Sequence, residues 1–305
     1  MAPAFYIATY VGVICFAVGC LRRIRQYASL PLHLRWELYP VPHEAPSQVS
    51  HGGSYFEESE WWTKPRRFNV VGELRAMASE IFLFKSLWDS NRRLWWRSFS
   101  FHVGLYCISA FLFVQAVLLL GASVGAHPPI AVTNVTTLVG RAGLALTILG
   151  SAALLWRRAT DRESRDYTHI ADYAHLSVIS LTSGLLLAGS FGGGAPSAGS
   201  LLRGLITFDT SLHIPAVLAS GLLLALAMVA YIPYSHMAHF IAKYFTFHSV
   251  RWDDATNFGN TLDTQISRNL AYRPTWAAAH IGTDGQKTWA EIATANPTTK
   301  QEVGR

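Results

Sequence analysis

Charged residues are scarce in this chain: of its 305 residues, 14% are Asp, Glu, Lys or Arg, while half are apolar. A typical soluble domain carries about 25% charged residues, so the composition excludes an ordinary water-soluble protein. The charges are also unevenly placed, because they are missing from long apolar runs and crowd between them. This distribution is typical of a helical protein that crosses a membrane several times, and the net charge of +6 then reports topology rather than nucleic-acid binding.

Cysteine is also scarce. Its three copies, Cys15, Cys20 and Cys107, all lie within apolar runs, and no Cys-x-x-Cys pair is present. This pattern excludes a secreted disulfide framework, a Cys-ligated iron–sulfur cluster of the chain's own and a c-type haem attachment. The cysteines therefore predict no disulfide, cluster or haem-attachment site in this chain.

Five apolar runs have the length of a membrane-spanning helix, which needs about 20 residues. They are Ala4–Leu21, Ser98–Ala122, Thr136–Trp156, Thr168–Ser190 and Leu212–Phe240. We expect an all-α integral membrane bundle with four parts: a first transmembrane helix (1–21), a loop platform (22–97), a four-helix membrane region (98–247) and a tail (248–305). The first run precedes a group of arginines and lacks a small-residue cleavage site, so we predict a retained anchor and not a signal peptide.

The basic residues predict an orientation. Of the 25 Lys and Arg residues, 23 lie in the 22–97 loop, the 157–166 connection and the segment after the fifth run. By the positive-inside rule these parts are cytoplasmic and the N-terminus is outside, in a cell inner membrane. The 22–97 loop is rich in Trp, Pro and mixed charges, with helix-like spacing from Phe68 to Ser90, so we predict a folded platform. The tail cannot build its own core, and we expect it to lie on a partner subunit.

Histidines inside apolar runs are the candidates for function, because ionisable groups in a membrane are costly and usually have a ligand or partner. His102 begins the second run and His239 ends the fifth, so antiparallel neighbours would bring them to the same depth. The iron of a b-type haem takes two axial ligands, and two imidazoles from neighbouring helices can supply them. The alternative for each is an inward polar side chain bonded to a backbone carbonyl.

The motifs around these histidines resemble a known family. The resemblance covers nearly the whole chain and rests on Ser100–Leu105, Tyr231–Phe240, Trp36–Glu44, Phe240–His248, Val250–Asp254 and Tyr272–Trp276. These segments resemble the gamma subunit of respiratory nitrate reductase, and in particular the related membrane cytochromes b that accompany heterodisulfide-reductase-like iron–sulfur proteins. The resemblance implies haem b held by His102 and His239, a membrane quinone such as menaquinone as substrate, and a cytoplasmic iron–sulfur subunit as partner.

The chain departs from the family pattern at the second haem, which the gamma subunit also holds between its second and fifth helices. Leu112 and Gly221 stand where the distal ligands would be. One haem is therefore expected, and a second is left open. His213 and His127 could hold a displaced haem at the outer surface; otherwise His213 faces a quinone headgroup or is a solvated residue at a helix end.

Four further residues have alternatives that the sequence leaves open. His175 with Asp172 suggests proton handling or a hydrogen bond to a quinone oxygen, and the alternative is a pair that satisfies itself. His236 is an alternative ligand or a residue that supports His239. Arg141 opens the third run at a place similar to a quinone-contacting basic residue of the family, and the alternatives are an interfacial cation or a haem propionate partner.

These observations predict an electron-transfer subunit of a quinone-linked oxidoreductase complex in contact with membrane lipid and not with nucleic acid. A haem b without a cluster or flavin moves electrons but has no substrate chemistry of its own, so partners must supply it. The alternative is a non-catalytic membrane anchor or assembly subunit whose histidines are structural. The direction of electron flow is not encoded in any named residue.

Overall fold

The computed structural model describes residues 2–30, 40–45, 53–65, 67–125, 129–256, 259, 261–278 and 280–295. The described chain is mostly helical, and its only β structure is one two-stranded antiparallel ladder and one isolated bridge. Five helices of this part of the chain are long and apolar enough to cross a membrane. The predicted all-α fold class is therefore confirmed, and the chain is a multi-pass membrane protein.

The chain divides into two compact units. Unit 1 comprises residues 1–25 and 70–241, and unit 2 comprises residues 26–69 and 242–305. The expected loop platform of 22–97 is thus shared: its 26–69 part belongs to unit 2, whereas 70–97 belongs to the unit that contains the membrane helices.

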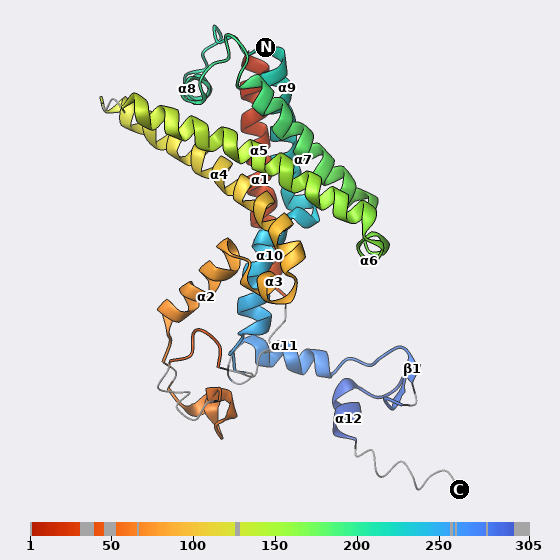
Figure 1. Ribbon diagram of the computed structural model, residues 1–305. Coiled ribbons are helices and arrows are strands. Elements are labelled where there is room, and N and C mark those ends of the chain that lie inside the picture. The colour runs from red at the N-terminus through yellow and green to blue at the C-terminus, as the bar shows by residue number, and fades with distance from the viewer. Residues whose placement is uncertain are drawn as a thin grey trace. The chain divides into compact units, whose positions relative to one another are not determined.

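Unit 1 is built from the transmembrane helices and the short helices that connect them (Figure 1). The candidate spans are α1 (Ala2–Ala28), α4 (Arg92–Ser123), α5 (Ile130–Thr160), α7 (Ile170–Gly189) and α9 (Ala216–Tyr231). The shorter helices are α2 (Val70–Phe82), α3 (Lys85–Ser90), α6 (Arg162–Asp166), α8 (Ala198–Thr207) and the start of α10 (His239–Phe245). Along the chain, α4 packs against α5, α5 against α7 and α7 against α9.

The helices approach one another closely where glycine removes the side chain. A Cβ atom on Gly150 of α5 would lie 2.5 Å from the Cα of Phe101 on α4, and one on Gly104 would lie 2.6 Å from the backbone nitrogen of Thr147. In lipid, helices associate through such backbone contacts because there is no hydrophobic force between them. The α4–α5 pair, which runs side by side in Figure 1, is therefore fixed by its small residues.

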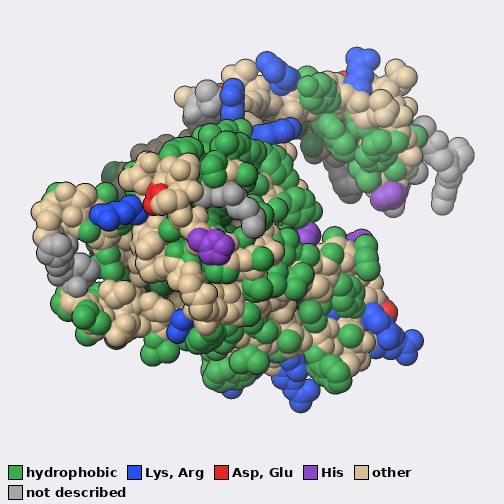
Figure 2. Space-filling view, turned by 90° about the horizontal axis from the view of Figure 1, so that it is seen from above, with side chains coloured by type: hydrophobic (Ala, Val, Ile, Leu, Met, Phe, Trp, Pro, Cys, Tyr) green, Lys and Arg blue, Asp and Glu red, His purple; other side chains and the backbone are tan. Residues whose placement is uncertain are grey.

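The outer surface of the spans is apolar. Large side chains such as Ile14, Phe113, Leu120, Leu138 and Leu149 are more than half exposed, and hydrophobic side chains cover much of the view in Figure 2. A water-soluble bundle would turn these side chains inward. Their exposure indicates that these helices have lipid as their surroundings.

Two helix boundaries differ from the sequence prediction in ways that matter below. Helix α5 begins at Ile130 and not at Thr136, so Arg141 lies well inside the helix instead of opening it. The predicted fifth run of Leu212–Phe240 is not one helix: α9 ends at Tyr231, two 3-10 turns follow at Ile232–Tyr234 and His236–Ala238, and His239 begins α10. Pro233 lies at this break, where it lacks an N–H for the helix ladder.

Unit 2 has little regular structure. It contains 3-10 turns at Tyr55–Glu57 and Trp61–Thr63, most of α10, a π-helical turn at Thr246–Arg251, α11 (Thr261–Leu270) and α12 (Trp289–Thr294). Strands β1 (Ala277–Ala278) and β2 (Thr283–Asp284) form a short hairpin before α12. A bridge between Glu44 and Phe68 closes the loop from 44 to 68 on itself.

Candidate functional site

His102 lies three turns into α4, with its ring half-buried. Its Nδ1 atom is 2.7 Å from the carbonyl oxygen of Ser98, one turn earlier. A carbonyl only accepts hydrogen bonds, so Nδ1 carries the proton and Nε2 carries the lone pair. A backbone hydrogen bond of this kind fixes the ring and its tautomer, as is usual for a histidine that binds a metal through its other nitrogen.

An aromatic residue from the segment before α4 packs on the His102 ring. The ring centroid of Phe84 lies 4.8 Å from that of His102, in an edge-to-face arrangement. Phe84 has a φ of 49°, a left-handed conformation that is unusual for a residue with a side chain. Such strain is kept where the surroundings determine it and it often marks a functional site.

Two hydrogen bonds from α4 hold the strained segment in place. Tyr106 Oη donates to the carbonyl of Ile81 at 2.7 Å, and Trp95 Nε1 donates to the carbonyl of Leu83 at the same distance. Both donors lie on the helix that carries His102. Phe84 was not among the residues predicted from the sequence. The apolar spacing of Phe68–Ser90 predicts helices in this segment but not the turn between them.

His239 faces His102. Their ring centroids are 6.1 Å apart and their planes are inclined at 80°. An imidazole nitrogen binds a first-row metal at about 2 Å and lies about 1 Å from its ring centroid, so two axial imidazoles have centroids about 6 Å apart. The observed separation is therefore the one that two histidines sharing an iron would have, so His102 and His239 could hold it.

The break in the fifth span positions His239. After α9 ends, Ser235 caps the next 3-10 turn by accepting a hydrogen bond from the backbone of Met237 at 3.1 Å. His239 then starts a new helix with its N–H bonded to the carbonyl of His236. His239 is therefore presented from the first turn of α10 and not, as the sequence suggested, from the end of a continuous transmembrane helix.

A second cluster of polar side chains joins α7 to the end of α9. Asp172 Oδ1 lies 3.2 Å from His236 Nε2, and His175 Nε2 lies 3.2 Å from Tyr231 Oη. The rings of His175 and His236 are 4.8 Å apart. Within the described residues Asp172 thus pairs with His236 and not with His175, so the self-satisfied Asp172–His175 pair is not what forms. We call these four residues the α7–α9 polar cluster.

The pairing of His127 with His213 for a second haem stays a prediction. His213 is exposed and precedes α9, in a segment without helical structure. His127 lies outside the described residues. Gly221 stands at the distal family position, where a Cβ atom would already lie 3.0 Å from the backbone nitrogen of Leu186 on α7. Gly221 therefore lets α9 pack closely against α7.

Arg141 contacts the C-terminal end of α7. Its Nη2 donates to the carbonyl of Ser190 at 2.6 Å, its Nε donates to the hydroxyl of the same residue at 3.2 Å, and its guanidinium lies 4.1 Å from the ring centroid of Phe191. A cation at a helix C-terminus satisfies the last carbonyls and the helix dipole. These contacts favour a structural role for Arg141 over the predicted quinone contact.

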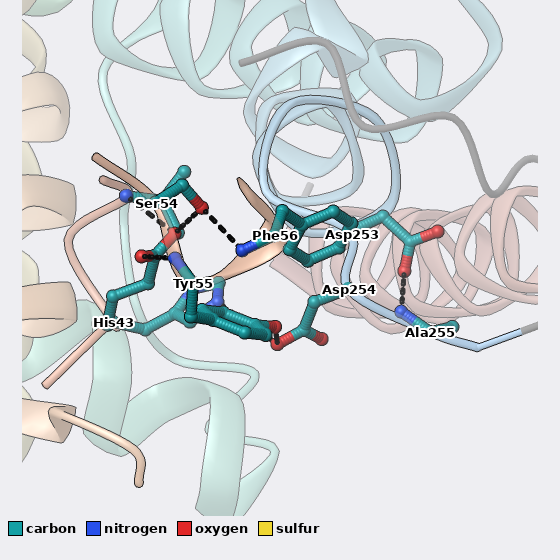
Figure 3. Close-up of polar contacts among 9 residues, drawn as sticks. His43, Ser54, Tyr55, Phe56, Asp253, Asp254 and Ala255 are labelled. Carbon is teal, nitrogen blue, oxygen red and sulfur yellow. Dashed lines mark hydrogen bonds and ion pairs between the residues drawn. The ribbon is translucent and has the colours of Figure 1, made fainter. Parts of the chain in front are cut away.

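Unit 2 has a buried polar centre of its own (Figure 3). Asp254 Oδ2 accepts a hydrogen bond of 2.8 Å from Tyr55 Oη and lies 3.3 Å from His43 Nε2. The neighbouring carboxylate of Glu44 accepts from the Ser54 hydroxyl at 2.8 Å and from the backbone of Tyr55 at 3.2 Å. These contacts join the 40–69 loop to the start of the tail, two segments that the resemblance singled out.

Among the described residues, no group of three or more His, Cys, Asp or Glu side chains is arranged to hold a metal ion. A haem needs only two protein ligands, because the macrocycle supplies the other four nitrogens. Comparison of the sequence with protein-family models gives no match, and comparison with curated proteins gives none either. The resemblance to nitrate reductase gamma subunits therefore stays a prediction that rests on the motifs given above.

Proposed function

We propose that this chain is the haem b subunit of a membrane oxidoreductase complex and that it transfers electrons between a membrane quinone and an iron–sulfur partner. The observation that carries the proposal is the pair of imidazoles 6.1 Å apart, presented by α4 and by the first turn of α10. His102 and His239 would hold the iron from opposite sides. The haem supplies one-electron redox chemistry when it is bound.

The surroundings of the pair support this role. The Ser98 carbonyl fixes the tautomer of His102 in the form that presents Nε2, and Phe84 packs against the ring. A histidine whose remaining nitrogen is held by a backbone carbonyl has a fixed orientation and a more basic donor atom. A structural histidine would also bond to a backbone carbonyl, so the support for ligation comes from the separation of the two rings, which matches two metal–nitrogen bonds.

The proposed reaction needs a partner that exchanges electrons with the quinone. Oxidation of a quinol to a quinone releases two electrons and two protons. A haem held by His102 and His239 would supply the one-electron chemistry that links the quinone to an iron–sulfur cluster of the partner in either direction, and the protons would be exchanged with water. In the orientation that the basic residues predict, His102 is near the cytoplasmic face, and the 22–97 loop and the tail are cytoplasmic. We propose that unit 2 docks the partner.

The test is the haem content of the purified full chain. A reduced-minus-oxidised visible spectrum with pyridine haemochrome quantitation should give about one haem b per chain. His102→Ala and His239→Ala should each abolish it, whereas His213→Ala, which changes an exposed histidine outside the helices, should not. Two haems per chain that fall to one in His213→Ala would show a second site. No haem in the wild-type chain would instead favour a non-catalytic membrane anchor.

A further inference from the structure

We infer that the α7–α9 polar cluster, formed by Asp172, His175, Tyr231 and His236, binds the headgroup of a membrane quinone. The inference rests on the proposed function for its redox role, but the binding itself needs no haem. It also replaces Arg141, which Ser190 and Phe191 engage, as the quinone contact of this chain.

The cluster is an assembly of three elements. Asp172 and His175 lie in the first two turns of α7, Tyr231 is the last residue of α9, and His236 begins the second 3-10 turn after it. The hydrogen bond between His175 and Tyr231 and the contact between Asp172 and His236 join these elements, each at 3.2 Å. The break at Pro233 is what turns His236 back toward α7.

The cluster is open at the surface of the bundle. The side chain of His236 is 59% exposed, and Tyr231 is 45% exposed. Ile170 and Phe240, which lie close to Asp172 and His236 in the sequence, are apolar and more than half exposed. A hydrogen-bonding cluster that is bordered by lipid-facing apolar side chains suits a ligand with a polar head and an isoprenoid tail that arrives through the bilayer.

The cluster does not satisfy itself completely. His175 Nδ1 is buried and has no hydrogen-bond partner within the part of the chain that the structure describes. Buried polar atoms in native proteins are nearly always paired, so an orphaned ring nitrogen indicates that a further group binds there. If the side chains of the cluster bonded only to one another, His175 Nδ1 would have a partner among them.

The chemistry of the cluster fits a quinone better than a phosphate or a metal. A quinone offers two carbonyl acceptors and a quinol two hydroxyl donors, and the cluster contains donors in Tyr231 and the imidazoles and an acceptor in Asp172. A phospholipid headgroup would meet the Asp172 carboxylate, which repels phosphate. The described residues hold no metal-binding group of three or more ligands.

The position also suits electron transfer. His236 and His239 are three residues apart, and three residues of a 3-10 helix rise by about 6 Å. The His239 N–H is bonded to the carbonyl of His236. A quinone held by His236 would therefore lie beside the proposed haem, with a short covalent and hydrogen-bonded path between them.

The test measures binding first. The purified full chain in detergent is titrated with 2-heptyl-4-hydroxyquinoline N-oxide, a quinone analogue whose fluorescence is quenched on binding. Asp172→Asn and His175→Ala should raise its Kd at least tenfold, and Tyr231→Phe should raise it several-fold. Tyr234→Phe is the matched control, because its hydroxyl lies outside the cluster and 3.4 Å from the carbonyl of Cys15; its Kd should stay within twofold of wild type.

Haem content separates this inference from the proposed function. The cluster variants should keep the wild-type haem content and full reduction by dithionite, while reduction by menadiol slows at least tenfold. Wild-type affinity for the analogue in all three cluster variants, or no binding to the wild-type chain, would overturn the inference even if haem is present. A chain without haem that still shows the cluster-dependent binding would support the inference and overturn the electron-transfer proposal.

Discussion

Arg141 Nη2 donates a hydrogen bond of 2.6 Å to the carbonyl oxygen of Ser190, so a cation inside the third transmembrane helix closes the C-terminal end of the fourth. Hydrogen bonds to a charged group contribute about 2 kcal/mol each. Arg141 makes two such bonds to Ser190, so Arg141→Met should destabilise the chain by about 4 kcal/mol in thermal unfolding followed by tryptophan fluorescence. Arg203→Met, at an exposed position of α8, is the control. A stable Arg141→Met chain that no longer oxidises quinol would restore the quinone role.

The glycine contacts between α4 and α5 predict that Gly→Ala has very different effects on stability at two positions. Gly150→Ala places a Cβ atom 2.5 Å from the backbone of Phe101, next to His102, whereas Gly184→Ala on α7 meets nothing within 4 Å. Overpacking of this kind costs about 1–3 kcal/mol. Gly150→Ala should lower the Tm and the haem content together, and Gly184→Ala should change neither. Equal Tm values for the two variants would show that α4 and α5 are not packed in this way.

The proposed ligation predicts the effect of replacing one imidazole by a thioether. Replacement of a histidine ligand by methionine raises the reduction potential of haem iron, because sulfur favours the ferrous state. His239→Met should keep a haem spectrum with a potential that is higher than that of the wild type in a redox titration. His239→Ala, which offers no ligand, should lose the haem. An unchanged potential in His239→Met would mean that His239 does not bind the iron.

The buried centre of unit 2 predicts a proteolysis result. Asp254→Ala removes the partner of Tyr55 Oη and of His43, whose side chain is only 7% exposed. Removal of one member of a buried polar pair leaves the others unpaired, which is costly. Trypsin should then cleave after Arg67 several-fold faster. Asp253→Ala, which removes a turn contact to the Ala255 backbone, is the matched control and should cleave at the wild-type rate.

The hairpin before α12 predicts a pH dependence. Hydrogen bonds from the backbones of Lys287 and Gln286 lower the pKa of Asp284 from 3.8 to about 2. Because the folded-state pKa is lowered, the stabilisation is complete above about pH 4 and is lost as the pH falls toward 2. Pepsin, which is active in this range, should cleave near Trp289 increasingly as the pH falls from 4 to 2. The side chain in Asp284→Asn cannot titrate. An equal increase in pepsin cleavage between pH 4 and 2 in this variant would show that Asp284 is not the cause.

The sequence predicted the spans well because hydropathy over about 20 residues depends on composition and not on partners. All five predicted runs overlap helices of the structure, and Phe68–Ser90 contains α2 and α3. The helix ends were less predictable. Helix α1 continues to Ala28, past the arginines that were expected to end it, because long cationic side chains can reach polar groups from a helix; Arg23 Nε donates to the carbonyl of Pro233 at 2.8 Å.

Hydropathy alone was enough to predict a multi-pass helical membrane protein with His102 and His239 at matching depth in two of its apolar runs. The folded chain was needed to show that their ring centroids lie 6.1 Å apart, that Phe84 packs on His102, and that Asp172 pairs with His236. Each residue of a helix is turned by about 100° from the one before it, so a side chain's direction depends on where its helix starts and stops. In this chain the break at Pro233, which a hydropathy run does not show, sets the directions of both His236 and His239.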